Sequence, residues 1–120
     1  MAGRSRLRQS ISRWANSGDQ ERDALIKEHL SRKDSPIGEA PDRVPVKLRG
    51  TLRSVTLQPR GGAPSLEAQL DDGTGTITII WLGRRRIVGV VPGRSMRVEG
   101  RTSVQDGRRV MFNPRYELVP

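Results

Sequence analysis

Apolar and polar residues alternate with a period of two from about Val46 to the end of the chain. This period is typical of strands that bury one face and expose the other. In the first strand the alternation slips by one residue between Leu52 and Val55, which predicts a β-bulge, and Gly50 predicts sharp curvature. The stretches that follow the period predict five strands: Val46–Leu57, Leu66–Leu70, Thr76–Leu82, Ser95–Val104 and Arg109–Tyr116. The fifth strand is expected either to end before Pro114 or to bulge there.

Turn-forming residues separate these stretches. Residues 58–64 are interpreted as a Gly/Pro loop, residues 71–75 as a turn and Asp106-Gly107 as a hairpin turn. Residues 83–93 interrupt the strand pattern and have room for one short helical turn. A long curved first strand, five strands in all and this interruption predict an all-β core, the five-stranded OB-fold Greek-key barrel. An SH3-like barrel is the alternative, but the insertion at 83–93 suits the OB-fold better.

The first 43 residues follow a different pattern. Leu7, Ile11 and Trp14 share one face of a helix, and a second helix is predicted for about residues 19–30. Residues 31–45 are rich in proline and glycine and are typical of a linker. We therefore divide the chain into an N-terminal helical extension with a linker, residues 1–43, and an OB-fold domain, residues 44–120.

The chain is strongly basic. Its 120 residues include 22 Lys+Arg and 13 Asp+Glu, a formal net charge of +9. Residues 44–120 hold 13 of the bases and six of the acids, a net charge of +7. Such an excess favours polyanionic partners such as nucleic acid. An arginine-rich composition is also typical of a GC-rich genome, so charge alone does not decide the function.

Several classes of function are disfavoured by residues that the sequence lacks. There is no cysteine, which excludes disulfides, thiolate metal sites and a cysteine nucleophile, and the only histidine is His29. No apolar run approaches the roughly 18 residues of a membrane span, and the basic start is not followed by the apolar stretch of a secretory signal. Asp71-Asp72-Gly73 is interpreted as a turn, because the further acidic positions of a calcium loop are absent. We expect a cytoplasmic protein with no enzymatic activity, no cofactor, no bound metal and no membrane association.

Three segments in order carry a resemblance to a known family. They are residues 70–81 (LDDGTGTITIIW), residues 92–100 (PGRSMRVEG) and residues 113–118 (NPRYEL). They resemble the OB domains of the anticodon-binding and helicase-wedge type, above all the wedge domain of RecG-type branch-migration helicases. The resemblance covers about residues 46–119 and implies binding of single-stranded or branched DNA. No G-x-x-x-x-G-K-[ST] phosphate loop occurs, so helicase activity is not implied. The chain is also similar to small stand-alone OB-fold proteins of actinobacteria.

Candidate binding residues follow from the way OB barrels bind, on the face of strands two and three and in the flanking loops. Single strands need cations for phosphates and flat side chains on which bases stack. Any one of the arginines could instead be a solvated surface charge without a binding role. Trp81, Phe112 and Trp14 could instead be packed in the core. Because few aromatics are then left, arginine planes would take over stacking, and we expect salt-dependent binding with little sequence preference. The candidates are Lys47, Arg49, Arg53, Arg60, Arg84, Arg85, Arg86, Arg97, Arg101, Arg108, Arg109, Arg115, Trp81 and Tyr116.

The sequence therefore predicts a nucleic-acid-binding module whose ligand is single-stranded or branched DNA, with RNA left open. The alternative is an adaptor that holds a protein partner through the barrel or the N-terminal helices. The scarcity of free aromatics and the acidic segment at residues 19–42 favour that alternative.

Overall fold

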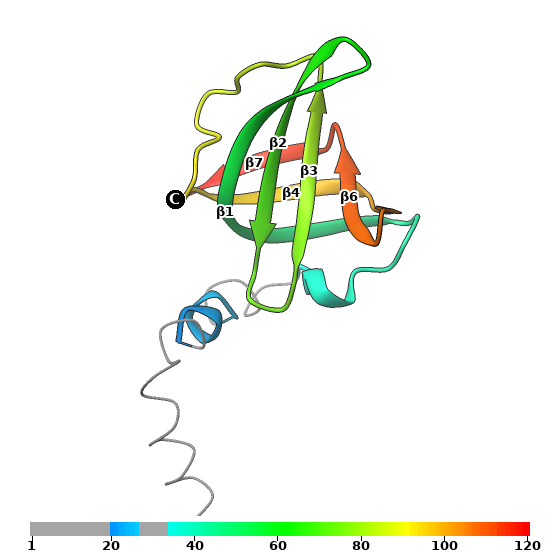
Figure 1. The fold of residues 1–120 in the computed structure, drawn as a ribbon. Coiled ribbons are helices and arrows are strands. Elements are labelled where there is room, and N and C mark those ends of the chain that lie inside the picture. Colours follow the sequence, from blue (N-terminus) through cyan, green and yellow to red (C-terminus); the bar gives the residue numbers. More distant parts are fainter. Residues whose placement is uncertain (1–19, 27–33) are drawn as a thin grey trace, which may run out of the picture.

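The computed structural model describes residues 20–26 and 34–120, and within them the fold is all-β (Figure 1). Residues 20–26 are helical, and a short 3-10 helix precedes the strands. Seven strands take the place of the five expected, in the sheet order β5-β6-β3-β2-β1-β4-β7. The elements are η1 (Ile37–Glu39), β1 (Pro45–Arg60), β2 (Ala63–Asp71), β3 (Thr76–Leu82), β4 (Ser95–Arg101), β5 (Ser103–Gln105), β6 (Arg108–Phe112) and β7 (Arg115–Val119).

The first strand is long and bent, as predicted. Its N-terminal half pairs with β4 and its C-terminal half with β2, both antiparallel. The register with β2 shifts between Leu52 and Ser54, which confirms the bulge. Gly50 lies just before the bulge, where a Cβ atom would come within 2.8 Å of the Asp71 carbonyl oxygen. The bend therefore needs glycine at this position because β1 passes so close to the end of β2.

The prediction of a loop at residues 58–64 is wrong. β1 continues to Arg60 and β2 begins at Ala63, so the turn consists of Gly61 and Gly62 alone, both with positive φ. This is the backbone conformation of a two-residue hairpin turn. Pro59 and Pro64 lie opposite each other, one pair in from the pair that closes the turn. Hydrogen-bonded pairs alternate along an antiparallel ladder, so neither proline has to donate a hydrogen bond to the other strand. Proline is thus tolerated here, although it suggests a loop in the sequence.

The fourth and fifth predicted strands are each broken in two. Thr102 separates β4 from β5, and Asn113-Pro114 separates β6 from β7. Asn113 has a φ of 47°, and its side-chain oxygen accepts a hydrogen bond from the Leu82 backbone N–H at 2.9 Å. The breaks let β6 pair parallel with β3 while β7 pairs antiparallel with β4. The sheet thereby curls, and Figure 1 shows β4 and β7 behind β1, β2 and β3. Residues 83–93 form turns without a helix.

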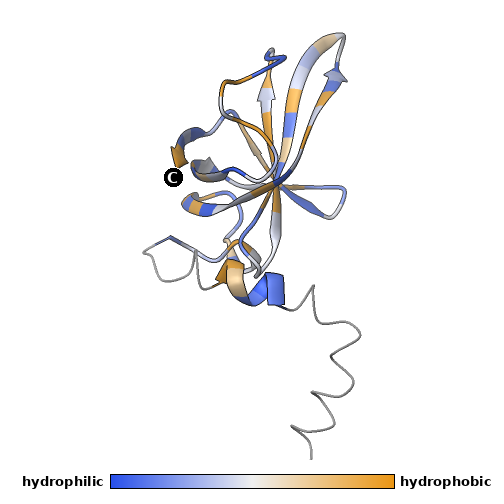
Figure 2. Ribbon diagram, turned by 90° about the vertical axis from the view of Figure 1, so that its left-hand side faces the viewer, coloured by the Kyte–Doolittle hydropathy of each residue, from blue (hydrophilic) through white to orange (hydrophobic). Residues whose placement is uncertain are grey.

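The core lies inside the curled sheet, and Figure 2 shows apolar and polar positions alternating along the strands. Ile77, Ile79 and Trp81 are buried on one face of β3, as the alternation predicts. Ile37 and Ala40 belong to the same core although they precede the strands. The predicted division at residue 43/44 stays a prediction, and the core extends to both sides of it.

The turn between β2 and β3 is held against η1. The Asp72 carboxylate accepts hydrogen bonds from the backbone N–H groups of Ile37 and Thr74, both at 2.9 Å, and from the Thr74 hydroxyl at 2.6 Å. The Asp71 carboxylate accepts one from the Gly73 backbone N–H at 2.7 Å. Both aspartates thus accept hydrogen bonds within the predicted turn, and Asp72 also holds η1 against it.

The predicted second helix is seen in part, since residues 20–26 are helical and Leu25 is buried. The predicted first helix, with Trp14, and residues 27–33, with His29, lie outside the described residues. Within residues 20–26 and 34–120, no helix is long and apolar enough to cross a membrane.

Candidate functional site

The outward face of β1, β2, β3 and β6 carries mostly uncharged polar side chains. The register aligns them in rows across the sheet. One row holds Ser54, Gln69 and Thr78, and the next holds Thr56, Glu67 and Ile80. Ser, Thr and Gln side chains present both donors and acceptors of hydrogen bonds. Apart from Glu67, the polar side chains of these rows can therefore bond a ligand without carrying charge.

Three adjoining hollows open on this face, with volumes of about 560, 410 and 70 Å³. Thr78 and Arg108 line all three, so the hollows meet at these two side chains. We call the combined depression the polar groove. Its charged and polar lining residues are Ser54, Thr56, Gln58, Arg60, Glu67, Gln69, Thr76, Thr78, Gln105, Asp106, Arg108 and Arg109.

Two hairpins bring cations to the polar groove. Arg60 comes from the end of β1, and Arg108 and Arg109 come from the β5–β6 hairpin, whose turn at Asp106-Gly107 was predicted. The Arg60 guanidinium lies 3.2 Å from the Glu67 carboxylate and 5.9 Å from the centroid of the Phe112 ring. That second distance is within the range of a cation–π contact. Arg109 donates a hydrogen bond to the Gly38 carbonyl at 3.0 Å. Arg108 is exposed and has no ion pair among the described residues.

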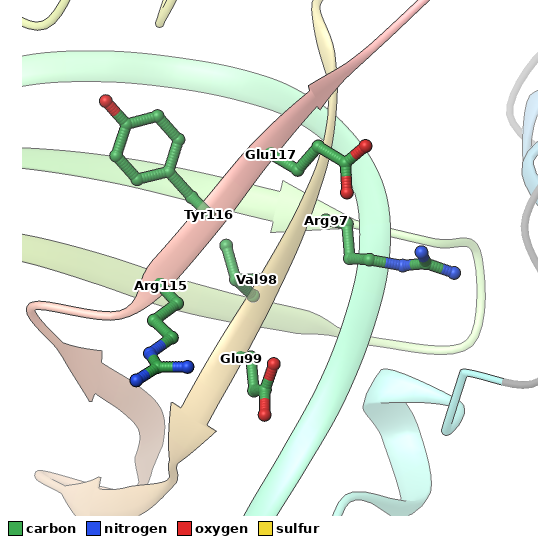
Figure 3. Close-up of a pocket in the computed structure, with 6 residues that line it drawn as sticks. All are labelled: Arg97, Val98, Glu99, Arg115, Tyr116 and Glu117. Atoms are coloured by element: carbon green, nitrogen blue, oxygen red, sulfur yellow. The ribbon is translucent and has the colours of Figure 1, made fainter.

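A second group of predicted residues lies elsewhere, on the outward face of β1, β4 and β7 (Figure 3). Across the strands, Glu99 lies opposite both Lys47 and Arg115, and Arg97 lies opposite both Arg49 and Glu117. Glu99 thus lies between two bases, whereas Arg97 lies between a base and an acid, and we call this surface the charge ladder. It consists of Lys47, Arg49, Arg97, Glu99, Arg115 and Glu117.

The charge ladder is neutralised further by Asp34. Its buried carboxylate accepts hydrogen bonds from the Arg97 guanidinium at 2.9 and 3.3 Å. This hydrogen bond, together with the negative charge of Asp34, raises the pKa of Arg97 above its usual value. Arg49 is buried, and no group within residues 20–26 and 34–120 forms a hydrogen bond with its Nε. Since acids interleave with these bases, the charge ladder attracts a polyanion less than the number of its bases suggests.

Two further candidates have partners of their own. Arg53 lies 3.5 Å from Glu21 and 3.6 Å from Asp71. Arg101 donates a hydrogen bond to the Arg43 carbonyl at 3.0 Å. Neither residue lines the polar groove.

Arg84, Arg85 and Arg86 form a third basic group. All three are exposed, directly beyond the end of β3, and none pairs with an acid in the part of the chain that the structure describes. Gly83 donates a backbone hydrogen bond to the Pro64 carbonyl at 2.9 Å, which ties the start of this loop to the β1–β2 hairpin. The three arginines thus lie past one end of the polar groove and do not line it.

The aromatic candidates do not line the polar groove. Trp81 is 4% exposed and belongs to the core, so it is not a stacking surface in this conformation. Tyr116 is 42% exposed and its ring meets that of Trp81 edge-on, with centroids 5.8 Å apart. Phe112, expected in the core, is half-buried beside Arg60, and Met111 takes the core position instead.

Sequence reasoning missed the uncharged side chains of the polar groove. Gln58, Gln69, Thr56 and Thr78 occupy outward positions of the strand pattern, and that alternation was the available signal. Which of the candidate residues contact a ligand stays a prediction.

Comparison with known proteins supports the fold. No family model matches the chain, and no curated protein matches its sequence. A structure of RecG bound to a three-way DNA junction matches 72% of this chain with a TM-score of 0.59 and 19% identity. A structure of a replication protein A heterotrimer bound to single-stranded DNA matches 80% of this chain with a TM-score of 0.51 and 16% identity. At these identities the matches bear on the fold alone, and they support an OB-fold.

The two matches differ in extent. This chain spans only 12% of the length of the RecG chain but 75% of the replication protein A chain. The similarity to RecG therefore concerns one part of a much larger protein. Whether the chain is of actinobacterial type, as its sequence resemblance implies, stays a prediction.

Proposed function

We propose that the chain is an OB-fold module that binds single-stranded or branched DNA through the polar groove and has no enzymatic activity. In this proposal the seven strands form the five-stranded barrel, with β4 and β5 as one bent strand and β6 and β7 as another. The observation that carries the proposal is the position of the polar groove. It lies on β2 and β3 between the β1–β2 and β5–β6 hairpins, where OB barrels bind their ligands.

The proposed binding mode follows from the lining of the groove. Arg60, Arg108 and Arg109 neutralise phosphates at its walls, and the amides and hydroxyls of its floor bond base edges and sugars. Phe112 does not line the groove, so the surface for base stacking in this proposal is the planar guanidinium of Arg60, which the Phe112 ring backs. With a few phosphate contacts and little stacking, we expect modest affinity that falls steeply with salt.

The proposal is tested by fluorescence anisotropy with labelled single-stranded DNA, single-stranded RNA and a forked duplex, each titrated at several salt concentrations. We expect binding to single-stranded and forked DNA, with a slope of log K against log salt of about −2 for three phosphate contacts to a single strand. Failure to bind any of the three at low salt, or binding that is independent of salt, would contradict the proposal.

The arginine cluster beyond β3 gives a second expected result. Replacing Arg84, Arg85 and Arg86 together with alanine should weaken binding of a 30-nucleotide strand by about fivefold, because a strand that leaves the groove passes them. A strand of about ten nucleotides, which the groove alone accommodates, should bind as before. Anisotropy with both lengths measures the difference. Equal losses for both lengths would show that the cluster contacts the strand inside the groove.

The runner-up function is an adaptor for a protein partner. The observation in its favour is that the loop after β3 exposes apolar side chains, with Val88 88% and Val91 53% exposed. Exposed apolar groups of this kind are typical of interaction surfaces when they form a larger patch. If no nucleic acid binds, affinity capture with wild-type protein and with a Val88→Asp variant would test this function.

A further inference from the structure

A carboxylate lies inside the polar groove. Glu67 points outward from the middle of β2, between Thr56 of β1 and Ile80 of β3, and lines two of the three hollows. Its side chain is only 17% exposed. The neighbouring row of the floor, by contrast, is Ser54, Gln69 and Thr78 without any charge.

Only one of the two carboxylate oxygens of Glu67 accepts a hydrogen bond from another described residue. Arg60 donates to its Oε1 at 3.2 Å. Among the described residues no hydrogen bond reaches the other oxygen, Oε2. An ionised carboxylate only accepts hydrogen bonds, so a ligand can donate a hydrogen bond to this oxygen. A phosphate cannot supply one and is repelled, whereas the amino group of a base can.

Arg60 and Glu67 together present a donor beside an acceptor. Cytosine offers the matching pair on one edge, because its N4 amino group donates and its N3 accepts. A carboxylate accepting from N4 of cytosine is an established mode of base recognition. In the same orientation, uracil and thymine put a carbonyl oxygen against the carboxylate and an N–H against the guanidinium, so both contacts are mismatched. They could match the pair only if the base were turned over, which would also reverse its backbone in the groove.

From these observations we propose that Glu67 makes the polar groove select cytosine over uracil and thymine at the position beside Arg60. This inference rests on the proposed function and replaces the expectation of little sequence preference. The selectivity is local, because the rest of the floor has only uncharged side chains that accept any base edge.

The test compares oligodeoxycytidine with oligodeoxyuridine of about 12 nucleotides by anisotropy at one salt concentration. The two bases have the same ring size and differ in the group at C4, so shape and backbone are matched. We expect wild-type protein to bind the cytidine strand about fivefold more tightly, the effect of one hydrogen bond gained and one repulsion avoided. Glu67→Gln should bring the ratio close to one, since an amide both donates and accepts. Glu99→Gln, on the charge ladder, removes a carboxylate elsewhere and should leave the ratio unchanged.

The outcomes separate this inference from the proposed function. If both strands bind wild-type protein equally, Glu67 does not read bases, and the inference is overturned while the module still binds DNA. If Glu67→Gln tightens both strands by the same factor, the carboxylate acts only as a repulsive charge, and the inference is again overturned. If neither strand binds, the proposed function itself fails.

Discussion

A variant with alanine at both Arg60 and Arg108 is expected to bind single-stranded DNA about 30-fold more weakly than the wild type at moderate salt. These two arginines reach the polar groove from opposite hairpins, and Arg108 lines all three hollows. Each removed phosphate contact should also reduce the slope of log K against log salt by about 0.7. Anisotropy titrations at several salt concentrations measure both quantities.

The charge ladder offers a control with the same change of net charge. Lys47 and Arg115 are exposed and flank Glu99 there, away from the polar groove. Alanine at both positions should change affinity by less than about threefold, through long-range attraction alone. Thermal melting of both double variants should confirm that they remain folded. Equal losses in the two variants would mean that binding depends on net charge, and the groove would lose its role.

Trp81→Ala is expected to lower the free energy of unfolding by about 3–5 kcal/mol. The side chain is 4% exposed, lies in the core beside Leu66 of β2 and meets the Tyr116 ring edge-on. Its removal leaves a large cavity that the surrounding strands cannot fill, since interiors are close-packed. Thermal or denaturant unfolding followed by circular dichroism measures the loss.

The adjacent residue provides the control for this prediction. Leu82 follows Trp81 on β3 and is 46% exposed, so Leu82→Ala should cost about 1 kcal/mol or less. A Trp81→Ala variant that melts like the wild type but binds DNA poorly would contradict the core position of Trp81. It would instead assign the ring to stacking on a base.

The elements that the sequence predicted best are those in which one face of a strand is buried. In residues 76–82 every second side chain, Ile77, Ile79 and Trp81, is apolar and buried, and β3 has these bounds. The bulge between Leu52 and Ser54 was visible because a register slip moves every later side chain to the other face. Local alternation is thus enough to locate a strand whose buried face is continuous.

The breaks in the last strands depended on contacts that are distant in the sequence. β6 ends just before Asn113, whose side-chain oxygen accepts a hydrogen bond from the backbone N–H of Leu82, 31 residues earlier. Within β6, Met111 pairs with Ile79 and lies in the core, and Phe112 lies beside Arg60. No local pattern indicates this pairing.

The sequence predicted where on the fold the candidate site lies, but it did not predict which residues line it. The hairpin residues Arg60, Arg108 and Arg109 follow from the strand order alone. Arg97 could not be set apart from them, because its partner Asp34 lies 63 residues away. Outward positions are evident from alternation, but only the curl of the sheet decides which of them share a surface.

The contact between η1 and the β2–β3 turn has a consequence for the order of events during translation. Ile37 leaves the ribosome early, yet the carboxylate that holds its backbone N–H belongs to Asp72, 35 residues later. A nascent chain that stops before Asp72 has no partner for η1 and leaves Ile37 in contact with water. Closing a loop of this length costs little more entropy than closing one of half the length. The contact between η1 and the turn can therefore form only once β2 and that turn have emerged, while Arg109 of β6, which donates to the Gly38 carbonyl of η1, follows later.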